Sequence, residues 1–323
     1  MSIETFLCQG FSPCPAFAIF RSGTSPAEES IYSESLICYN IQKQKGGYEY
    51  GKDSSEYQWR NVMDNFLIHP FNAGFFFLLA VSAIPVAVGI IFFRHRDEGE
   101  KQKYVVTLYI ALAIFFILYK SLLPLDKGYM IVCDQFYGGF TYLNELPLNP
   151  CNITLMIMPF ALIRKNRKLI AMCFFESLLG AFLAFIMPIS GFDGYPVFSI
   201  HIFGYYITHM TLFFAAFLLP VFGIYRPSCS DTKGVLSMML LMACGVFVID
   251  ILLRMSGLCE AANYFFLFYH DGNALLKLVY DLIPIPFVYI VLIGCIVTVA
   301  VIPLITFLFG MRDVIKKRHQ IGS

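Results

Sequence analysis

Hydrophobic and polar positions divide the chain into a polar N-terminal part and a series of long apolar runs. Residues 1–70 are polar, contain Ser and Gly, and show little periodicity. Seven apolar runs follow, at about residues 72–93, 104–123, 148–163, 169–188, 198–223, 234–253 and 285–310. Runs of about 20 apolar residues predict helices that cross a bilayer. The pattern therefore predicts an all-α polytopic integral membrane bundle of about seven transmembrane helices.

Short clusters of Lys and Arg alternate with loops that hold almost none. They follow the first, third and fifth apolar runs and also close the chain. Because basic residues accumulate on the cytoplasmic side, the C-terminus is predicted to be cytoplasmic and the N-terminal region to face outward. This divides the chain into an extracytoplasmic tail or cap (1–70), a membrane domain (71–311) and a short basic tail (312–323). Residues 255–284 are mixed in character, and a re-entrant segment there is left open.

Composition agrees with a membrane protein and excludes some partners. Hydrophobic residues make up 58% of the chain and charged residues 14%, against roughly 45–50% and 25% in globular proteins. The net charge is +1, and no basic cluster interleaved with aromatics occurs, so no nucleic-acid partner is expected. No C-x-x-C or phosphate-binding loop occurs, and His201 and His209 are too far apart for a paired zinc motif. We therefore expect no metal and no cofactor.

A candidate nucleophile stands at the start of the third apolar run. Asn149 suits the N-cap position, where its side-chain oxygen would accept from free backbone N–H groups, and Pro150 suits the first helical position. Cys151 then lies in the first turn, where free N–H groups and the helix dipole favour a thiolate and could hold an oxyanion. The alternative is an inert cysteine buried in an apolar helix.

His209 is the candidate base for this cysteine. Counting from the cytoplasmic ends of their helices, Cys151 lies about 18 Å deep and His209 about 21 Å, at 1.5 Å per residue. A Cys and a His at similar depth suit a base-assisted thiolate. Tyr205 and Tyr206, close to His209, and Asn152, beside Cys151, are candidate supporting residues. The alternative for His209 is a neutral histidine that hydrogen-bonds between helices.

The remaining ionisable groups in the apolar runs are predicted to be structural. Glu176 is expected deeper than the Cys/His pair, about 12 Å from the inside. Asp250 has Arg254 one turn away, so the two are expected to pair. Such groups are costly in a membrane and normally find polar partners in the bundle. In the predicted outer loops, Cys133 and Cys259 are a candidate disulfide.

Two passages carry a resemblance to a known family. They are Leu146-Pro-Leu-Asn-Pro-Cys151, at the start of an apolar helix, and Leu179-Gly-Ala-Phe-Leu-Ala-Phe-Ile-Met-Pro188, followed by Tyr205-Tyr206-Ile-Thr-His209. Over about residues 70–310 the chain resembles the transmembrane protein one-six-four acyltransferase family and its bacterial YwaF-like relatives.

The resemblance implies a seven-span membrane acyltransferase that moves fatty acyl chains between phospholipids, with an ether phospholipid or lysophospholipid as acceptor. It implies an acyl-cysteine intermediate, with Cys151 as the nucleophile and His209 as its partner. Phospholipids, lysophospholipids and the bilayer are then the expected partners.

Two other functions remain open from the residues. An intramembrane lipid hydrolase would use the same Cys/His pair and differ only in admitting water. A non-enzymatic seven-span receptor or transporter would need neither residue. However, no D-R-Y follows the third run, no N-P-x-x-Y occurs in the last, and the halves show no internal repeat. Under a transport function, Glu176 and Asp250 would belong to an ion path.

Overall fold

The computed structural model of the chain describes residues 66–137, 139–187, 194–271 and 273–321. The predicted N-terminal tail therefore lies, up to residue 65, outside the described residues. Within the described ranges the structure is helical, with no β-strand and one isolated bridge between Leu67 and Pro196. The all-α prediction is confirmed for these residues.

Six described helices are long and apolar enough to cross a membrane. They are α4 (Ala73–Phe93), α5 (Glu98–Leu122), α8 (Arg167–Ile186), α9 (Ile200–Val221), α10 (Thr232–Met255) and α12 (Val288–Ile321). Each contains most of one predicted apolar run. The remaining run forms α7 (Pro150–Ile163), whose 14 residues span about 21 Å, less than a hydrocarbon core of about 30 Å. Two further helices, α6 (Lys127–Tyr137) and α11 (Ala274–Leu282), are short.

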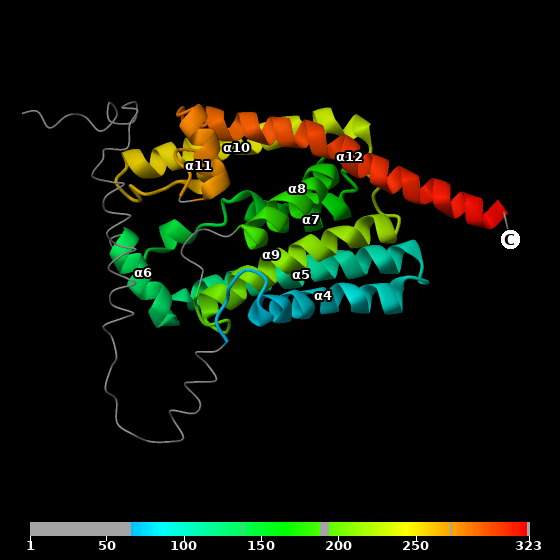
Figure 1. Cartoon of the computed structure of the whole chain (residues 1–323), viewed down its shortest axis with the longest axis horizontal. Helices are drawn as coiled ribbons and strands as arrows, with labels where there is room; N and C mark the ends of the chain where they lie inside the picture. The colour runs from blue at the N-terminus through cyan, green and yellow to red at the C-terminus, as the bar shows by residue number, and fades with distance from the viewer. Residues whose placement is uncertain (1–65, 138, 188–193, 272, 322–323) are drawn as a thin grey trace, which may run out of the picture. The chain divides into compact units, whose positions relative to one another are not determined.

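The helices are arranged with α7 and α8 between two outer groups. In Figure 1 they lie between α4, α5 and α9 on one side and α10 and α12 on the other. Helix α8 packs against α7, α9 and α10, and α5 packs against both α7 and α9. The apolar windows of α8 and α9 are 61% and 67% buried, against 28% for α4 and α5, 22% for α10 and 17% for α12. The candidate site residues on α7, α8 and α9 therefore belong to the interior of the bundle.

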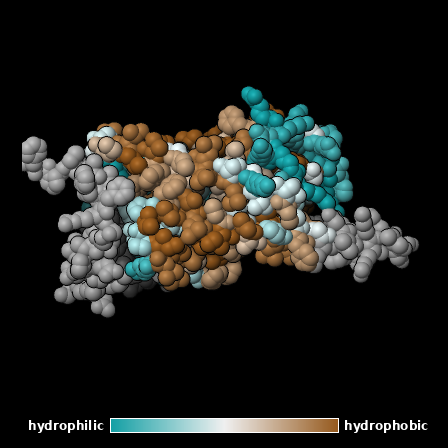
Figure 2. All heavy atoms as spheres, turned by 90° about the horizontal axis from the view of Figure 1, so that it is seen from above, coloured by the Kyte–Doolittle hydropathy of each residue, from teal (hydrophilic) through white to brown (hydrophobic). Residues whose placement is uncertain are grey.

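The outer helices expose many large apolar side chains along their length. Examples are Ile91 on α4, Ile114 on α5, Leu241 on α10 and Phe307 on α12, which are each more than half exposed. Figure 2 shows hydrophobic atoms covering the middle of one face, with hydrophilic atoms gathered toward one end. Exposed apolar area on this scale is unfavourable in water and favourable against lipid tails. These helices thus form the lipid-facing surface of a membrane protein.

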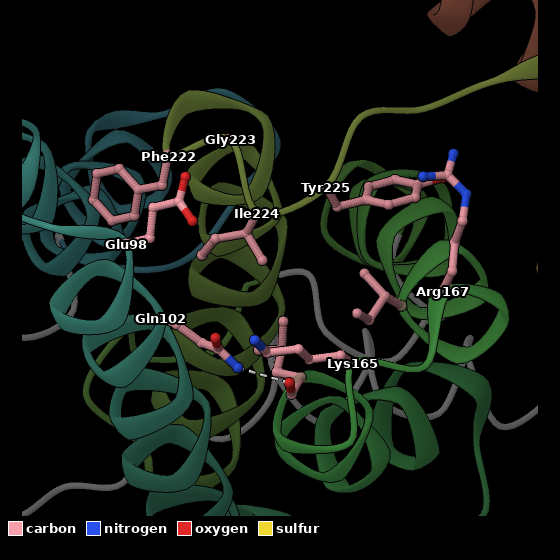
Figure 3. A pocket seen from close by; sticks show the side chains of 10 residues that line it. Glu98, Gln102, Lys165, Arg167, Phe222, Gly223, Ile224 and Tyr225 are labelled. Carbon is pink, nitrogen blue, oxygen red and sulfur yellow. Dashed lines mark hydrogen bonds between the residues drawn. The ribbon is translucent and has the colours of Figure 1, made fainter.

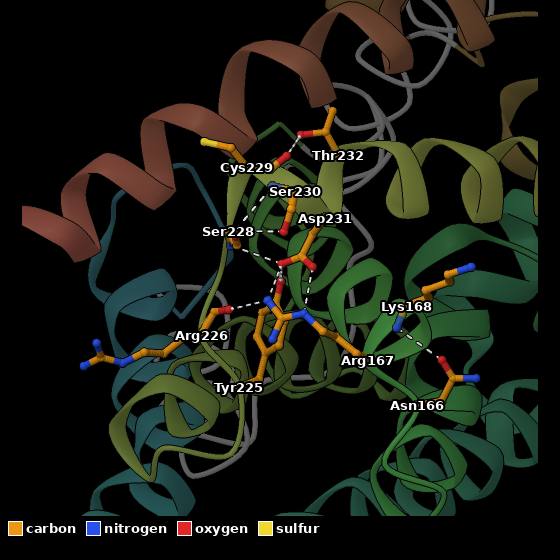
Figure 4. Close-up of polar contacts among 10 residues, drawn as sticks. All are labelled: Asn166, Arg167, Lys168, Tyr225, Arg226, Ser228, Cys229, Ser230, Asp231 and Thr232. Atoms are coloured by element: carbon orange, nitrogen blue, oxygen red, sulfur yellow. Dashed lines mark hydrogen bonds and ion pairs between the residues drawn. The ribbon is translucent and has the colours of Figure 1, made fainter.

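A buried carboxylate ties α8 to the segment between α9 and α10 (Figure 4). Asp231 accepts two hydrogen bonds from Arg167, through Nε and Nη2 at 2.9 Å each. It also accepts from the Tyr225 hydroxyl at 2.8 Å and the Ser228 N–H at 3.1 Å. Burial, and then the hydrogen bond to Asp231, raise the pKa of Tyr225. A bidentate Arg–carboxylate pair with further donors is one of the stronger polar contacts available to a protein.

Replacing Asp231 with Ala is expected to lower the free energy of unfolding by about 2–3 kcal/mol, because three donors lose a charged acceptor. Unfolding followed by circular dichroism in detergent would measure this. The matched control is Asp281→Ala, which breaks an exposed Lys277–Asp281 pair of 3.8 Å. That change is expected to cost about 0.5 kcal/mol or less. Equal losses in the two variants would show that the Asp231 cluster adds nothing beyond a surface ion pair.

Candidate active site

Cys151 lies in the first turn of α7, as the sequence predicts. Asn149 takes an extended N-cap conformation (φ −71°, ψ 150°), and Pro150 occupies the first helical position. Cys151 is 7% exposed and belongs to the main apolar core, between α7 and its neighbours. Asn152 is buried beside it. The nucleophile candidate is thus held on a rigid helix start and shielded from bulk solvent.

The predicted capping hydrogen bond of Asn149 is wrong. Its side chain makes no hydrogen bond to its own helix. The side-chain oxygen instead accepts from the backbone N–H of Phe265 at 3.0 Å. Phe265 has a left-handed backbone (φ 65°), and this long-range hydrogen bond satisfies its backbone N–H. Asn149 therefore joins two distant segments rather than capping one.

The segment before α7 is held by the loop that follows α10. The Tyr264 hydroxyl donates to the Leu143 carbonyl and accepts from the Leu146 N–H. Cys259 donates its S–H to the side-chain oxygen of Asn144 at 2.9 Å. Together with the Asn149–Phe265 bond, these contacts tie the segment before Cys151 to the loop after α10.

The candidate disulfide between Cys133 and Cys259 is absent, and both cysteines are free. The physical reason lies in the same loop, because the Cys259 sulfur is directed at Asn144. Cys133 is buried on α6, one turn after Tyr129. Burial raises the pKa of the Cys133 thiol, which makes it less reactive.

The first turn of α7 leaves one backbone donor open beside the sulfur. Pro150 has no N–H, and the N–H groups of Asn152 and Ile153 both donate to the Asn149 carbonyl at 3.0 Å. Among the backbone hydrogen bonds of the described residues, no carbonyl accepts from the Cys151 N–H. The side chain of Asn152 is buried and its oxygen has no hydrogen-bond partner among the described residues. The Cys151 N–H is therefore the backbone group best placed to hold an oxyanion.

His209 is oriented by its own helix. Its Nδ1 lies 2.8 Å from the Tyr205 carbonyl one turn earlier. A carbonyl can only accept, so Nδ1 carries the proton and Nε2 of the neutral ring has a free lone pair. The Tyr205 ring lies against the imidazole, with centroids 4.2 Å apart, and its hydroxyl donates to the Ala184 carbonyl at 2.8 Å. Tyr205 thus fixes the ring and selects the tautomer that can act as a base.

The two halves of the candidate site meet through α8 and α5. Helices α7 and α9 both pack against these two helices. Tyr205 is near enough to Cys151 for the two side chains to interact electrostatically. Tyr205 and the imidazole stacked on it lie on α9, and Cys151 lies on α7, with α5 and α8 packed against both helices. Tyr206 is buried against Phe75 of α4, at 6.2 Å between ring centroids, in a core cluster against which Tyr205 also packs.

Glu176 lies beside Cys151, which sequence reasoning missed. It is 7% exposed on α8 and interacts electrostatically with the thiol. The signal in the sequence is the glycine one turn later, Gly180, over which the long side chain extends. Counting helix rise to the Cα placed Glu176 deeper than the cysteine because it ignored the length and direction of the side chain.

The expected Asp250–Arg254 pair is also corrected. Arg254 donates through Nε to the Ala262 carbonyl at 2.6 Å, and its guanidinium lies over the Phe268 ring at 4.2 Å. Asp250 is fully buried, and neither of its oxygens has a hydrogen-bond partner in the described part of the chain. Arg254 sits at the end of α10 and is used to shape the following loop, so it does not form a direct ion pair with Asp250.

A pocket of about 240 Å³ opens at the other end of α7 (Figure 3). It is lined by Glu98, Gln102, Leu162, Lys165, Arg167, Ile170, Phe222, Gly223, Ile224 and Tyr225. The Gln102 side chain donates to the Leu162 carbonyl across it, at 2.8 Å. The length of α7, about 21 Å, separates this pocket from Cys151. It is therefore not part of the candidate active site.

These features define the class of the protein as a multi-pass integral membrane protein, helical over its described residues, with a buried cysteine and glutamate side by side in its interior. Residues 69–308 match the model of the TMEM164 family. The chain belongs to the TMEM164 family, as the two sequence passages indicate. Comparisons with curated proteins and with solved structures found no match. The family match covers every residue of the candidate site.

Proposed function

We propose that this protein is a membrane acyltransferase that moves a fatty acyl chain between phospholipids through an acyl-cysteine at Cys151. The observation that supports this most directly is the position of the thiol. It lies in the first turn of a helix, beside an open backbone N–H, on the interior of a membrane protein. Tyr205, whose ring lies against the His209 imidazole, interacts electrostatically with this thiol. Ether phospholipids or lysophospholipids are the proposed acceptors.

The first half-reaction forms the acyl-enzyme. The Cys151 thiol gives its proton to Nε2 of His209, and the sulfur attacks the ester carbonyl of a donor phospholipid. The carbonyl oxygen becomes negatively charged and accepts a hydrogen bond from the Cys151 N–H. The ester C–O bond then breaks, and the lysophospholipid oxygen leaves with a proton given by an acidic group of the site. The product is a thioester on Cys151.

The second half-reaction reverses these changes on a new alcohol. The hydroxyl of an acceptor lysophospholipid gives its proton to the same group, which is now a base, and attacks the thioester carbonyl. The C–S bond breaks, and the sulfur regains its proton from His209. No proton is gained or lost over the two halves. The 7% exposure of Cys151 keeps water from the thioester, and this favours transfer over hydrolysis.

The proposed membrane placement has seven spans, with α7 as the short one. The C-terminus is cytoplasmic and the N-terminal region faces outward, according to the distribution of basic residues. Because α7 is too short to cross the core, its first turn lies below the outer surface. Cys151 would then meet the acyl ester region of a lipid in the outer half of the bilayer.

Labelling of the purified wild-type protein tests the proposal. The protein would be incubated with a phospholipid that carries an alkynyl acyl chain, and its intact mass measured. An adduct of one acyl chain that is released by hydroxylamine and maps to the peptide containing Cys151 is expected. Added lysophospholipid should discharge the adduct into phospholipid rather than into free fatty acid.

Two results would contradict the proposal in different ways. Release of the acyl chain as free fatty acid, despite saturating acceptor, would identify a lipid hydrolase that uses the same residues. No adduct on a folded, lipid-stabilised protein would return Cys151 to a packing role and favour a receptor or transporter.

A further inference from the structure

Because Gly180 on α8 has no side chain, it leaves a space that the side chains of Glu176 and Cys151 share. A Cβ placed on Gly180 would collide with Oε1 of Glu176 and lie 3.2 Å from Sγ of Cys151. Both atoms thus lie within 3.2 Å of the position that this Cβ would take. The sulfur and the carboxyl oxygen are therefore separated by no more than twice 3.2 Å. No larger residue at position 180 leaves both groups where they are.

Helix geometry explains how the carboxyl reaches the thiol. Residues four apart lie above one another on a helix, so the side chain of Glu176 can extend over Gly180, one turn toward the Cys151 end of the bundle. Of the described side chains, none forms an ion pair with Glu176. Burying a carboxyl group among apolar helices without a cationic partner is unfavourable. A purely structural acid at this position is therefore poorly explained by its surroundings.

We infer that Glu176 is the acid–base group for the alcohol oxygen in acyl transfer at Cys151, while His209 serves the sulfur. This inference rests on the proposed function. In the tetrahedral intermediate, the former carbonyl carbon is bonded both to Sγ and to the alcohol oxygen, so this oxygen lies next to the sulfur. It then lies in the gap between Sγ and the Glu176 carboxyl, within the reach that general acid catalysis requires.

The assignment completes the movement of protons. In the first half-reaction the Glu176 carboxylic acid gives its proton to the departing lysophospholipid oxygen as the C–O bond breaks. In the second half the Glu176 carboxylate takes a proton from the attacking hydroxyl as the new C–O bond forms. His209 gains and then returns the sulfur's proton in the same two steps. Each group therefore ends the cycle in the form in which it began.

Two acyl donors with different leaving groups test the role of Glu176. One is a phospholipid, whose alkoxide must be protonated to leave; the other is a p-nitrophenyl ester of the same fatty acid, whose phenolate leaves without a proton. The Glu176→Gln variant is expected to form the acyl-enzyme about a hundredfold more slowly with the phospholipid and within about threefold of wild type with the aryl ester. Equal losses with both donors, or no loss with either, would overturn the inference.

A second pair of variants decides the matter if Glu176→Gln does not fold. Gly180→Ala places a methyl group against the carboxyl and near the sulfur, so acylation by the phospholipid is expected to fall while the aryl ester is less affected. Gly245→Ala is the control, because its Cβ would meet nothing within 4 Å. Equal rates for these two variants would overturn the inference.

The proposed function fails separately from the inference. If the Cys151→Ala variant still forms the adduct with both donors, the acyl-cysteine itself is wrong. If that variant loses both adducts while Glu176→Gln behaves as wild type, only the role of Glu176 is wrong.

Discussion

Acyl transfer is expected to fall to the uncatalysed background when Cys151 is replaced by Ala. The variant keeps the start of α7, since Asn149 and Pro150 set the backbone there, but it has no atom that can form a thioester. Removing a covalent nucleophile eliminates the pathway rather than weakening it. The measurement is the rate at which labelled acyl chain appears on an acceptor lysophospholipid, in detergent or in vesicles.

The control for this variant is another buried cysteine of the same core. Cys173 on α8 is fully buried, so Cys173→Ala removes a thiol of similar burial without touching the helix start. It is expected to retain activity within about threefold, with a small loss of stability from the lost sulfur. Full activity in Cys151→Ala, or an equal loss in both variants, would contradict an acyl-cysteine at Cys151.

Replacing His209 with Gln is expected to slow acyl-enzyme formation by about two to four orders of magnitude, the usual contribution of a general base. Gln is close to His in size, so packing against the Tyr205 ring is largely kept while the basic nitrogen is lost. The adduct should still form slowly, because the nucleophile remains. Rapid mixing with the alkynyl donor, followed by quenching and intact mass, would give the rate.

His201 provides the matched histidine control on the same helix. Its backbone N–H donates to Asp126 and its ring lies against Tyr129, at 4.1 Å between centroids. It therefore belongs to the end of the bundle near α6, two turns before His209. The His201→Gln variant is expected to acylate at a rate within about threefold of wild type, since it removes no proton acceptor from the thiol. If His201→Gln is as slow as His209→Gln, the loss reflects general damage to α9.

The helices and the position of Cys151 at a helix start follow from local sequence. Apolar runs define helix positions because the bilayer and the core both demand them, and α4, α8, α9 and α10 begin and end within two residues of the predicted limits. The start of α7 is equally local, since Pro150 can stand at a first helical position and the preceding Asn is extended. What length alone could not decide is whether the short α7 counts as a span.

The long-range hydrogen bonds could not be predicted because they depend on which distant segment the fold places beside a side chain. Asn149 has the chemistry of an N-cap, yet the N–H of Phe265, 116 residues away, takes its oxygen. Arg254 is correctly spaced to pair with Asp250, yet a carbonyl and an aromatic ring compete for it more effectively. In both cases intrinsic preference is overridden by tertiary structure.

The position of the Glu176 carboxyl could not be predicted for a different reason. The residue was recognised as an unusual acid in an apolar helix, but its Cα depth placed it away from the cysteine. A glutamate side chain can bridge a full helical turn when the residue four positions on is glycine, as Gly180 is here. Depth estimates for long polar side chains therefore need the neighbours one turn away as well as the helix rise.

The hydrogen bonds between the segment at the start of α7 and the loop after α10 have a consequence for biosynthesis. During synthesis from the N-terminus, α7 with its Cys151 thiol is complete well before Tyr264 and Phe265 have been made. Until then Leu143, Leu146 and Asn149 lack the partners that hold them in the finished protein. The segment before Cys151 is therefore held in place only after nearly the whole bundle has been inserted. Under the proposed acyl-cysteine mechanism, this order keeps the nascent membrane protein from acylating itself or nearby lipids before it is closed.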